Sequence, residues 1–347
     1  MVSLPTMRES NTRISQTLPP GLVAVFVGAT SGIGEATLKH LAKNTRQPRI
    51  YFLGRRQTEG DRIKKELEEV NPGGEYHFLS YDLSLLKNVD DACRYIQGKE
   101  KAINLLFLTS GTLTKGRKTV EGLNYSIALG YFSRTRFIVD LLPQLRAAKS
   151  LRRVVTVLAG TKEGPILTDD FQANDAGIVA ARGHQVSMVT SALKTIAQQA
   201  PEVSFVHDFP GFVETTLGRE FTGFWAAVGN GVFNMLMPLL CMSTAEAGER
   251  HAFLATSARF PPRSRKGGDD DDDDDEGLGV PRGEDVDVAV SVDGDVGGGV
   301  YSVDYKAEGT DKRVRDVIKG LSDDGTVEKA WKYTEEEFLR ITGSLAI

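Results

Sequence analysis

Short apolar runs alternate with amphipathic helical patterns along most of this chain. The runs that predict buried strands cover residues 23–27, 49–53, 76–81, 103–109, 154–158 and 203–207. Helical patterns fall between them, among them residues 32–43, 120–145 and 185–199. Regular alternation of strands and helices is typical of a doubly wound parallel sheet covered by helices on both faces. We therefore predict a single α/β domain over residues 21–258.

The first 20 residues and the segment after residue 258 follow a different pattern. Residues 1–20 are polar and end in Pro19-Pro20, which predicts a flexible arm. Residues 259–281 contain the acidic run 269–276 and few apolar side chains, so we expect a disordered acidic linker.

The C-terminal part resumes a structured pattern. We expect residues 282–347 to pack on the domain as an extension. Within it, residues 286–303 predict a short hairpin that adds an edge to the sheet, and residues 327–341 predict a closing helix. Before the linker, a helix over residues 244–257 is predicted to begin at a cap built from Ser243 and Glu246.

Composition narrows the functional classes. The formal charge is −5, but the acidic run 269–276 supplies eight negative charges, so the rest of the chain is slightly positive. Lysine and arginine are scattered, which argues against a nucleic-acid partner. The two cysteines, Cys93 and Cys241, form no metal-binding pattern, and no apolar signal segment precedes the domain. We expect a cytoplasmic protein without a metal, and we interpret the acidic run as a solvated linker rather than a metal site.

A glycine-rich turn follows the first predicted strand. The residues expected at this turn are Gly28, Thr30, Ser31, Gly32, Ile33 and Gly34. Glycine allows a tight turn and a close approach of phosphate, and the helix that follows offers free N–H groups to an anion. The sequence therefore predicts a dinucleotide site in a Rossmann-type sheet, although a loop glycine without a ligand remains the alternative.

The ends of the next strands refine this prediction. Arg55 follows the second strand, where an arginine suits the 2′-phosphate of NADP(H) and an acidic residue would suit NAD; a solvated charge is its alternative role. Asp82 and Leu83 follow the third strand, where Asp82 could bind the adenine amino group or cap the next helix, in competition with Ser84. Ser110-Gly111 ends the fourth strand beside the expected cofactor.

Together these motifs resemble the short-chain dehydrogenase/reductase family. Gly28, Gly32 and Gly34 have the spacing of that family's TGxxxGxG motif, and Asp82-Leu83 matches its adenine-side aspartate. Its PGxVxT turn, near the nicotinamide, is matched by Pro210, Gly211, Val213 and Thr215. The resemblance implies an NADP-dependent oxidoreductase, and by analogy dimers or tetramers.

The same resemblance fails at the catalytic residues. Members of the family use an Asn-Ser-Tyr-Lys tetrad, whose expected positions here hold Ile127, Leu158-Ala159-Gly160, His184 and Met188. His184 is the candidate acid in place of the tyrosine, with a structural histidine as the alternative. Other groups that could reach the pocket are Tyr125, Tyr131, Lys162, Glu163 and Asp208.

The segment after the PGxVxT turn predicts the nature of the substrate. In the family it forms a mobile lid, expected here at about residues 212–243, and residues 221–242 are strongly apolar. We expect an apolar small-molecule substrate, with weak contact to a membrane surface or plain core packing as alternatives.

Segments such as NLLFLTSGTL and VHDFPGFVETT are similar to segments of fungal short-chain dehydrogenase-like proteins of secondary metabolism. The resemblance implies a tailoring step on a natural product. Because the tetrad is replaced, a non-redox enzyme such as an isomerase or cyclase, or a non-catalytic binding protein, remains the alternative.

Overall fold

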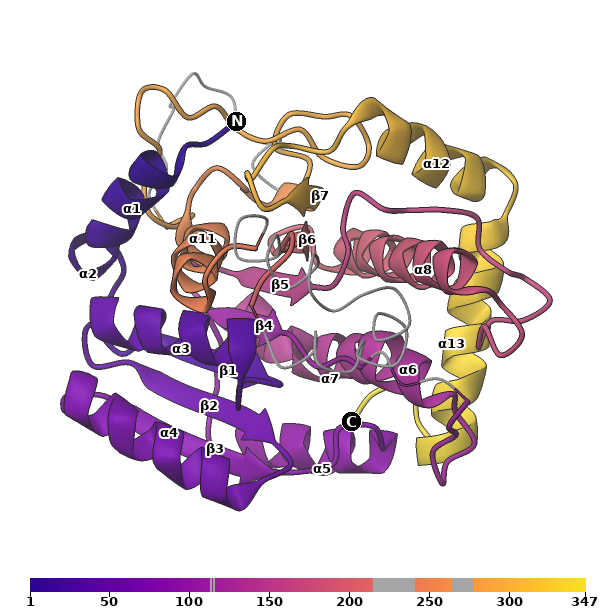
Figure 1. Ribbon diagram of the computed structural model, residues 1–347, viewed down its shortest axis with the longest axis horizontal. Helices are drawn as coiled ribbons and strands as arrows, with labels where there is room; N and C mark the ends of the chain where they lie inside the picture. Colours follow the sequence, from indigo (N-terminus) through magenta and orange to yellow (C-terminus); the bar gives the residue numbers. More distant parts are fainter. Residues whose placement is uncertain (113, 115, 215–240, 264–276) are drawn as a thin grey trace, which may run out of the picture.

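The computed structural model describes residues 1–112, 114, 116–214, 241–263 and 277–347. In this part of the chain, seven parallel strands form one sheet in the order β3-β2-β1-β4-β5-β6-β7 (Figure 1). The strands are β1 (Val23–Val27), β2 (Arg49–Gly54), β3 (Glu75–Ser80), β4 (Leu105–Leu108), β5 (Arg153–Val157), β6 (Ser204–Phe209) and β7 (Val300–Asp304). The strand order reverses between β1 and β4, which is where doubly wound folds open their ligand crevice.

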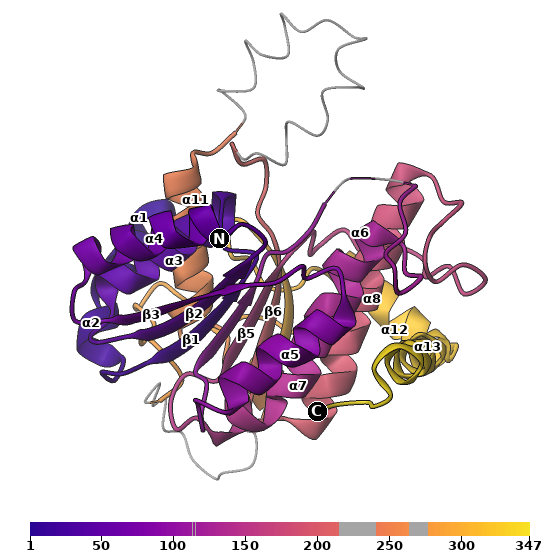
Figure 2. The same cartoon turned by 90° about the horizontal axis from the view of Figure 1, so that it is seen from below.

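Helices cover both faces of the sheet (Figure 2). One face carries α1 (Leu4–Thr12), α2 (Ile14–Thr17), α3 (Gly32–Asn44), α4 (Gln57–Val70) and α11 (Thr244–Thr256). The other carries α5 (Leu86–Gln97), α6 (Tyr125–Ile127), the π-helical turn η1 (Ala128–Phe132), α7 (Ser133–Ala147), α8 (Ile178–Gln199), α12 (Lys312–Asp323) and α13 (Thr326–Thr342). The predicted α/β class is confirmed.

Alternation along each strand builds the two hydrophobic cores. In β1 all five residues are buried; Val25 and Val27 face the α5 and α7 side, whereas Ala24 and Phe26 face α3. Side chains of successive strand residues point to opposite faces, so a strand covered on both sides needs a continuous apolar run. This requirement explains why the central strands could be located from the sequence.

The N-terminal arm differs from its prediction. Residues 4–12 form α1. Its N-cap residue is Ser3, whose Oγ accepts the Thr6 N–H at 3.2 Å. Met7 is fully buried, and the Asn11 side chain donates to the Glu249 carbonyl of α11 at 2.8 Å. The prediction of a flexible arm is therefore wrong, because a few well-spaced side chains are enough to dock this short helix.

The long helix predicted over residues 120–145 begins later than expected. Gly122 has a φ of +85°, which breaks any helix there, and Val120 is 92% exposed. Asn124 then caps α6, its side chain accepting the Ser126 N–H at 3.1 Å. In contrast, α8 begins at Ile178, earlier than the predicted residue 185.

The described C-terminal residues 277–347 pack on the domain, and their internal structure differs from the predicted hairpin. The edge strand is confirmed as β7, which pairs parallel with β6. The predicted hairpin is reduced to one antiparallel bridge, Val290 to Val296. Helix α12 was missed because only Val314 and Ile318 are buried in a highly charged segment.

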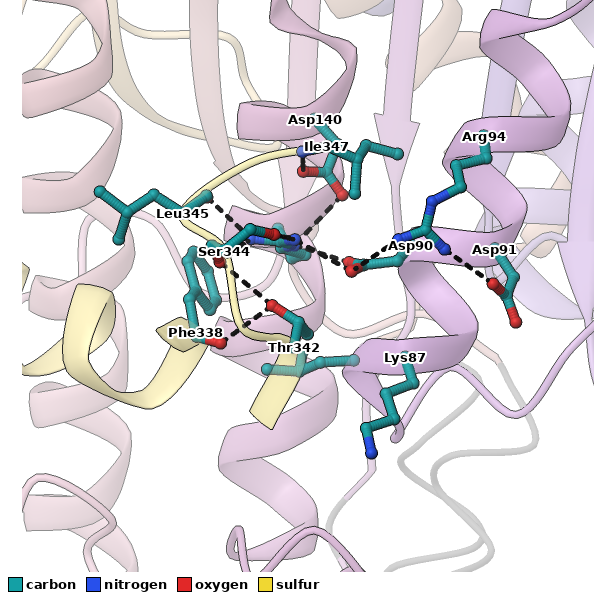
Figure 3. Close-up of polar contacts among 12 residues, drawn as sticks. Lys87, Asp90, Asp91, Arg94, Asp140, Phe338, Thr342, Ser344, Leu345 and Ile347 are labelled. Carbon is teal, nitrogen blue, oxygen red and sulfur yellow. Dashed lines mark hydrogen bonds and ion pairs between the residues drawn. The ribbon is translucent and has the colours of Figure 1, made fainter. Parts of the chain in front are cut away.

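The end of the chain is fastened to α5 and α7 (Figure 3). The buried Arg136 donates to the Asp90 carboxylate at 2.7 Å and to the Leu345 carbonyl at 2.7 Å. The Asp140 carboxylate accepts the Ile347 N–H at 3.2 Å, and burial raises the pKa of Asp140 to about 7. Most of the predicted lid (212–243), its apolar stretch and much of the predicted linker (259–281) lie outside the described residues.

Candidate functional site

The turn between β1 and α3 is shaped by close approaches that only glycine permits. A Cβ on Gly28, which has a φ of +84°, would lie 2.6 Å from the Ser110 backbone nitrogen after β4. A Cβ on Gly34 would lie 2.6 Å from Thr109 Oγ1. These two glycines therefore let the turn and α3 pack directly on the end of β4, as a dinucleotide fold requires.

The start of α3 is arranged to receive an anion. The helix begins at Gly32, and the side chain of its N-cap residue, Ser31, makes no capping hydrogen bond. The first N–H groups of a helix lack partners within the helix and carry its positive dipole end. Thr30 lies against Gly54 at the end of β2, and Ile33 packs on the core. The geometry fits the pyrophosphate of a dinucleotide.

Two arginines lie around the Tyr125 ring beside the end of β2. Arg55 is exposed, and its Nη1 donates to Tyr125 Oη at 3.0 Å. The Arg117 guanidinium lies over the same ring, 4.4 Å from its centroid. Sequence reasoning missed Arg117, because its distance from β2 along the chain carries no signal of their proximity. The pair forms a basic site where the adenosine ribose of a dinucleotide would lie.

The Asp82 side chain does not cap α5. Its Oδ1 accepts the Ser84 N–H at 3.0 Å and the Ser84 hydroxyl at 2.7 Å. The first N–H groups of α5, from Leu86 and Lys87, instead donate to the Glu121 carboxylate. The capping alternative for Asp82 and Ser84 is therefore wrong, and the neighbouring Leu83 is buried. The adenine contact of Asp82 remains a prediction.

A buried arginine braces the ends of β4 and β5. Arg134 donates to the Ser110 carbonyl at 2.5 and 3.1 Å and to the Val157 carbonyl at 2.9 Å. It also donates to Thr156 Oγ1 at 2.6 Å, and burial lowers its pKa to about 9. Gly111 lies beside it, since a Cβ there would be 3.8 Å from Arg134 Nη2. Arg134 therefore holds the carboxyl ends of β4 and β5 together.

The Pro210-Gly211 turn follows β6 at the carboxyl edge of the sheet. Pro210 leads into Gly211, which has a φ of +74°. Val213 forms a parallel bridge with Met242, so the two ends of the predicted lid are joined. Thr215 lies outside the described residues.

Both ring nitrogens of His184 have hydrogen-bond partners within the protein. Its Nδ1 accepts the Leu167 N–H at 3.0 Å, and its Nε2 lies 3.0 Å from the Phe171 carbonyl, to which it must donate. The side chain is fully buried, and burial lowers its pKa. Both nitrogens hold the loop that follows β5, so the structure favours the structural alternative over the predicted acid.

The other tetrad positions are also filled by packing. Ile127 and Met188 are buried in the core. Ser187 donates to the Gly164 carbonyl at 2.6 Å and accepts the Gly164 N–H at 3.0 Å. The loop after β5 is thus fastened over the part of α8 where the family places its tyrosine.

The five remaining candidates are scattered. Tyr131 is buried and shares a 2.7 Å hydrogen bond with Thr334 of α13. Asp208 is buried on the α11 side, where its Oδ2 lies 2.8 Å from His251 Nε2, and burial raises its pKa. Tyr125 belongs to the basic site described above, whereas Lys162 and Glu163 follow β5. Only Lys162 among these five is exposed near the turn after β6.

A row of polar side chains crosses β5, β6 and β7 beneath the loop that follows β5. Thr156, His207 and Ser302 are neighbours in register. Thr190 Oγ1 lies 2.8 Å from His207 Nδ1 and donates to the Glu163 carboxylate at 2.9 Å. Burial and the nearby Arg134 charge lower the pKa of His207 to about 3, and burial raises that of Glu163. The row is a buried polar core, which hydrophobic patterning did not reveal.

In the described residues, no helix is long and apolar enough to cross a membrane, and no group of three or more His, Cys, Asp or Glu side chains could hold a metal ion.

Comparison with known proteins agrees with this architecture. The short chain dehydrogenase family model matches residues 22–159. Oxidoreductase AN1596 of Emericella nidulans is 36% identical, covering 89% of this chain and 90% of that protein. The short-chain dehydrogenase/reductase SAT2 of Stachybotrys chartarum is 30% identical, covering 91% of this chain and 92% of that protein.

Among solved structures, L-sorbose reductase from Gluconobacter frateurii, complexed with NADPH and L-sorbose, is similar in fold. It is 16% identical with a TM-score of 0.53, and the match covers 70% of this chain and 91% of that one. The fold, the glycine turn and the full-length relatives lead to one conclusion: the chain belongs to the short-chain dehydrogenase/reductase family, a family of oxidoreductases.

Proposed function

We propose that this protein is an NADP(H)-dependent oxidoreductase that acts on an apolar small molecule, in a tailoring step of fungal secondary metabolism. The observation that carries the proposal is the exposed Arg55, which follows β2 and contacts Tyr125 beside Arg117. Two guanidinium groups at the ribose end of a dinucleotide site would favour an added phosphate over a free hydroxyl.

The chain's own residues would hold the cofactor along the ends of the strands. The N–H groups at the start of α3 would bind the pyrophosphate, and the basic site of Arg55 and Arg117 would bind the 2′-phosphate. The turn at Pro210-Gly211 would lie beside the nicotinamide. When bound, NADPH would supply the hydride.

Support for an apolar substrate comes from the entrance of the predicted lid. Phe212 is 68% exposed at its start. Exposed apolar side chains near a binding site favour an apolar ligand. Relatives in Emericella and Stachybotrys support a fungal setting.

The decisive experiment is calorimetric titration with NADPH and, separately, NADH. We expect NADPH to bind more tightly, and Arg55→Ala to weaken NADPH by about 10- to 100-fold, since a charge-assisted hydrogen bond contributes about 1.5–3 kcal/mol. Arg56→Ala is the matched control, because this exposed neighbour makes no side-chain capping bond at the start of α4. Equal loss of NADH affinity in Arg55→Ala would refute the 2′-phosphate assignment, and no binding of either nucleotide would refute the cofactor.

One observation favours a second candidate, a non-redox enzyme or binding protein on the same fold. His184 and Met188 are buried at the positions of the family's tyrosine and lysine. Nicotinamide absorbance distinguishes the candidates: oxidation of NADPH with a panel of apolar ketones supports the first, whereas turnover without loss of absorbance supports the second.

A further inference from the structure

The chain turns sharply at Thr161, four residues after β5. Thr161 has a φ of +67°, a conformation that is rare and costly for a β-branched residue. Such strain persists only where surrounding contacts enforce it, and it clusters at functional sites.

The C-terminal extension supplies the enforcing contacts. Ser302 of β7 accepts the Thr161 N–H at 2.7 Å, and Arg313 of α12 donates to the Thr161 carbonyl. The second Arg313 nitrogen donates to the Glu163 carbonyl at 2.9 Å. The strained turn is therefore held by β7 and α12 together.

Glu163 points inward from the same turn and fixes it from below. Its carboxylate accepts hydrogen bonds from Ser302 at 2.6 Å and from Thr190 of α8 at 2.9 Å. Since Glu163 is only 3% exposed, its side chain cannot reach a ligand at the surface. Of the two charged residues in this turn, Glu163 is therefore buried in the interior.

Lys162 is the other charged residue, and it is exposed. Its ammonium lies 5.0 Å from the centroid of the Phe209 ring. In the described part of the chain, no carboxylate lies within 4.0 Å of this ammonium. The nearest strand neighbour of Phe209 is Asp304, and its Oδ1 already accepts the Lys306 N–H at 2.9 Å. Among the described residues, the Lys162 ammonium therefore has no anionic partner.

The position of this charge relates it to the site. Phe209 is the last residue of β6 and directly precedes the Pro210-Gly211 turn. An ammonium resting on an aromatic ring loses part of its freedom, so less entropy is lost when it binds an anion. We propose that Lys162 binds an anionic oxygen of the substrate, a carboxylate or an enolate carried on an apolar body, and that Arg313 is the positioning residue that holds it there. This inference rests on the proposed function and assigns its substrate class.

The test uses two probes that differ only in charge, 2-naphthoate and 2-naphthamide. Each is titrated into the full-length protein with and without saturating NADPH. We expect the unaltered protein to bind the carboxylate about 10-fold more tightly, and Lys162→Met to abolish that preference. Lys162→Arg should retain it, and Lys332→Met, which removes an exposed lysine of α13, should leave it unchanged.

The role of Arg313 has its own readout. Arg313→Ala should reduce the ratio of the two affinities, and Arg313→Lys should restore part of it. If Arg313→Ala lowers stability in urea but leaves the ratio unchanged, Arg313 is merely structural and the positioning role is wrong.

Three results overturn the assignment to Lys162: equal affinity of the unaltered protein for both probes, no binding of naphthoate at millimolar concentration, or an unchanged preference in Lys162→Met. Failure of the proposed function is seen separately. If NADPH does not bind but the naphthoate preference still depends on Lys162, the cofactor is refuted and the anion site stands.

Discussion

The two halves of the carboxyl edge of this sheet are built on different principles. The half at β1, β2 and β4 is defined by backbone: two glycines bring the turn onto β4, and the start of α3 has no side-chain cap. The half at β5, β6 and α8 is defined by buried side chains, with His184 and Ser187 holding the loop over the family's catalytic position. The first half keeps the glycine turn and a helix start without a side-chain cap. In the second half, the positions of the family's tyrosine and lysine hold the buried side chains of His184 and Met188.

From this difference we infer that cofactor binding and proton chemistry are separable on this fold. Backbone N–H groups and glycines bind a dinucleotide regardless of which acid serves the substrate. The side chains that serve the substrate can move to a neighbouring loop, as we infer for Lys162, without disturbing the first half.

Gly28→Ala should damage the first half most. The new Cβ would lie 2.6 Å from the Ser110 nitrogen at a positive φ, so we expect a loss of about 4 kcal/mol in the free energy of unfolding and no NADPH binding. Gly21→Ala is the control, because Gly21 also has a positive φ, +77°, but open space around it. That control should lose only about 1 kcal/mol in urea unfolding. Similar losses in both variants would show that backbone strain, not the close approach, explains the effect.

The sequence predicted the first half well because its signals are local. A glycine turn between an apolar strand and an amphipathic helix is set within about a dozen residues, and Gly28 and Gly34 lie where their spacing placed them. Arg117 was missed because an irregular segment, which has no periodic pattern, separates it from Tyr125, the ring it contacts.

The second half could not be predicted in the same way. His184 was a sound candidate from its spacing alone, but its partners Leu167 and Phe171 are contributed by an irregular loop. The polar row through His207 and Ser302 depends on strand register with β7, an edge strand nearly 100 residues further on. Long-range pairing of this kind leaves no mark in local hydrophobic patterning.

His184→Ala probes the second half directly. Removing the imidazole leaves the Leu167 N–H and the Phe171 carbonyl without partners, so we expect a loss of about 3 kcal/mol in stability and no change in NADPH affinity. His77→Ala, on the edge strand β3, should change urea unfolding by much less, because this half-buried ring mainly stacks on Tyr51. Unchanged stability with a lost reaction rate would instead restore His184 as the acid.

The pH dependence of stability tests the buried polar row. The folded pKa of His207 is about 3, below the ordinary value of 6.5, so the unfolded chain binds more protons below pH 6.5. Stability should therefore fall as pH falls from 6.5, by about 2 kcal/mol at pH 5 from this group. His207→Asn keeps a polar amide group near Thr190 but has no group that titrates in this range. The free energy of unfolding of this variant should therefore change less between pH 6.5 and 5. Parallel curves for the two proteins would show that His207 is not responsible.

The smallest expected effect, that of Arg117→Ala, tests which arginines form the phosphate site in the first half. Arg117→Ala should weaken NADPH binding by about 5-fold, near 1 kcal/mol, because its charge is exposed and screened. Arg55 and Arg117 both contact Tyr125, so their contributions should not add. A double-mutant cycle with NADPH therefore measures whether they act as one phosphate site. A coupling of at least 0.5 kcal/mol with NADPH, absent with NADH, means that both guanidinium groups bind the same phosphate. Strict additivity means that Arg55 binds it alone, and Arg117 then serves only to hold the Tyr125 ring in place.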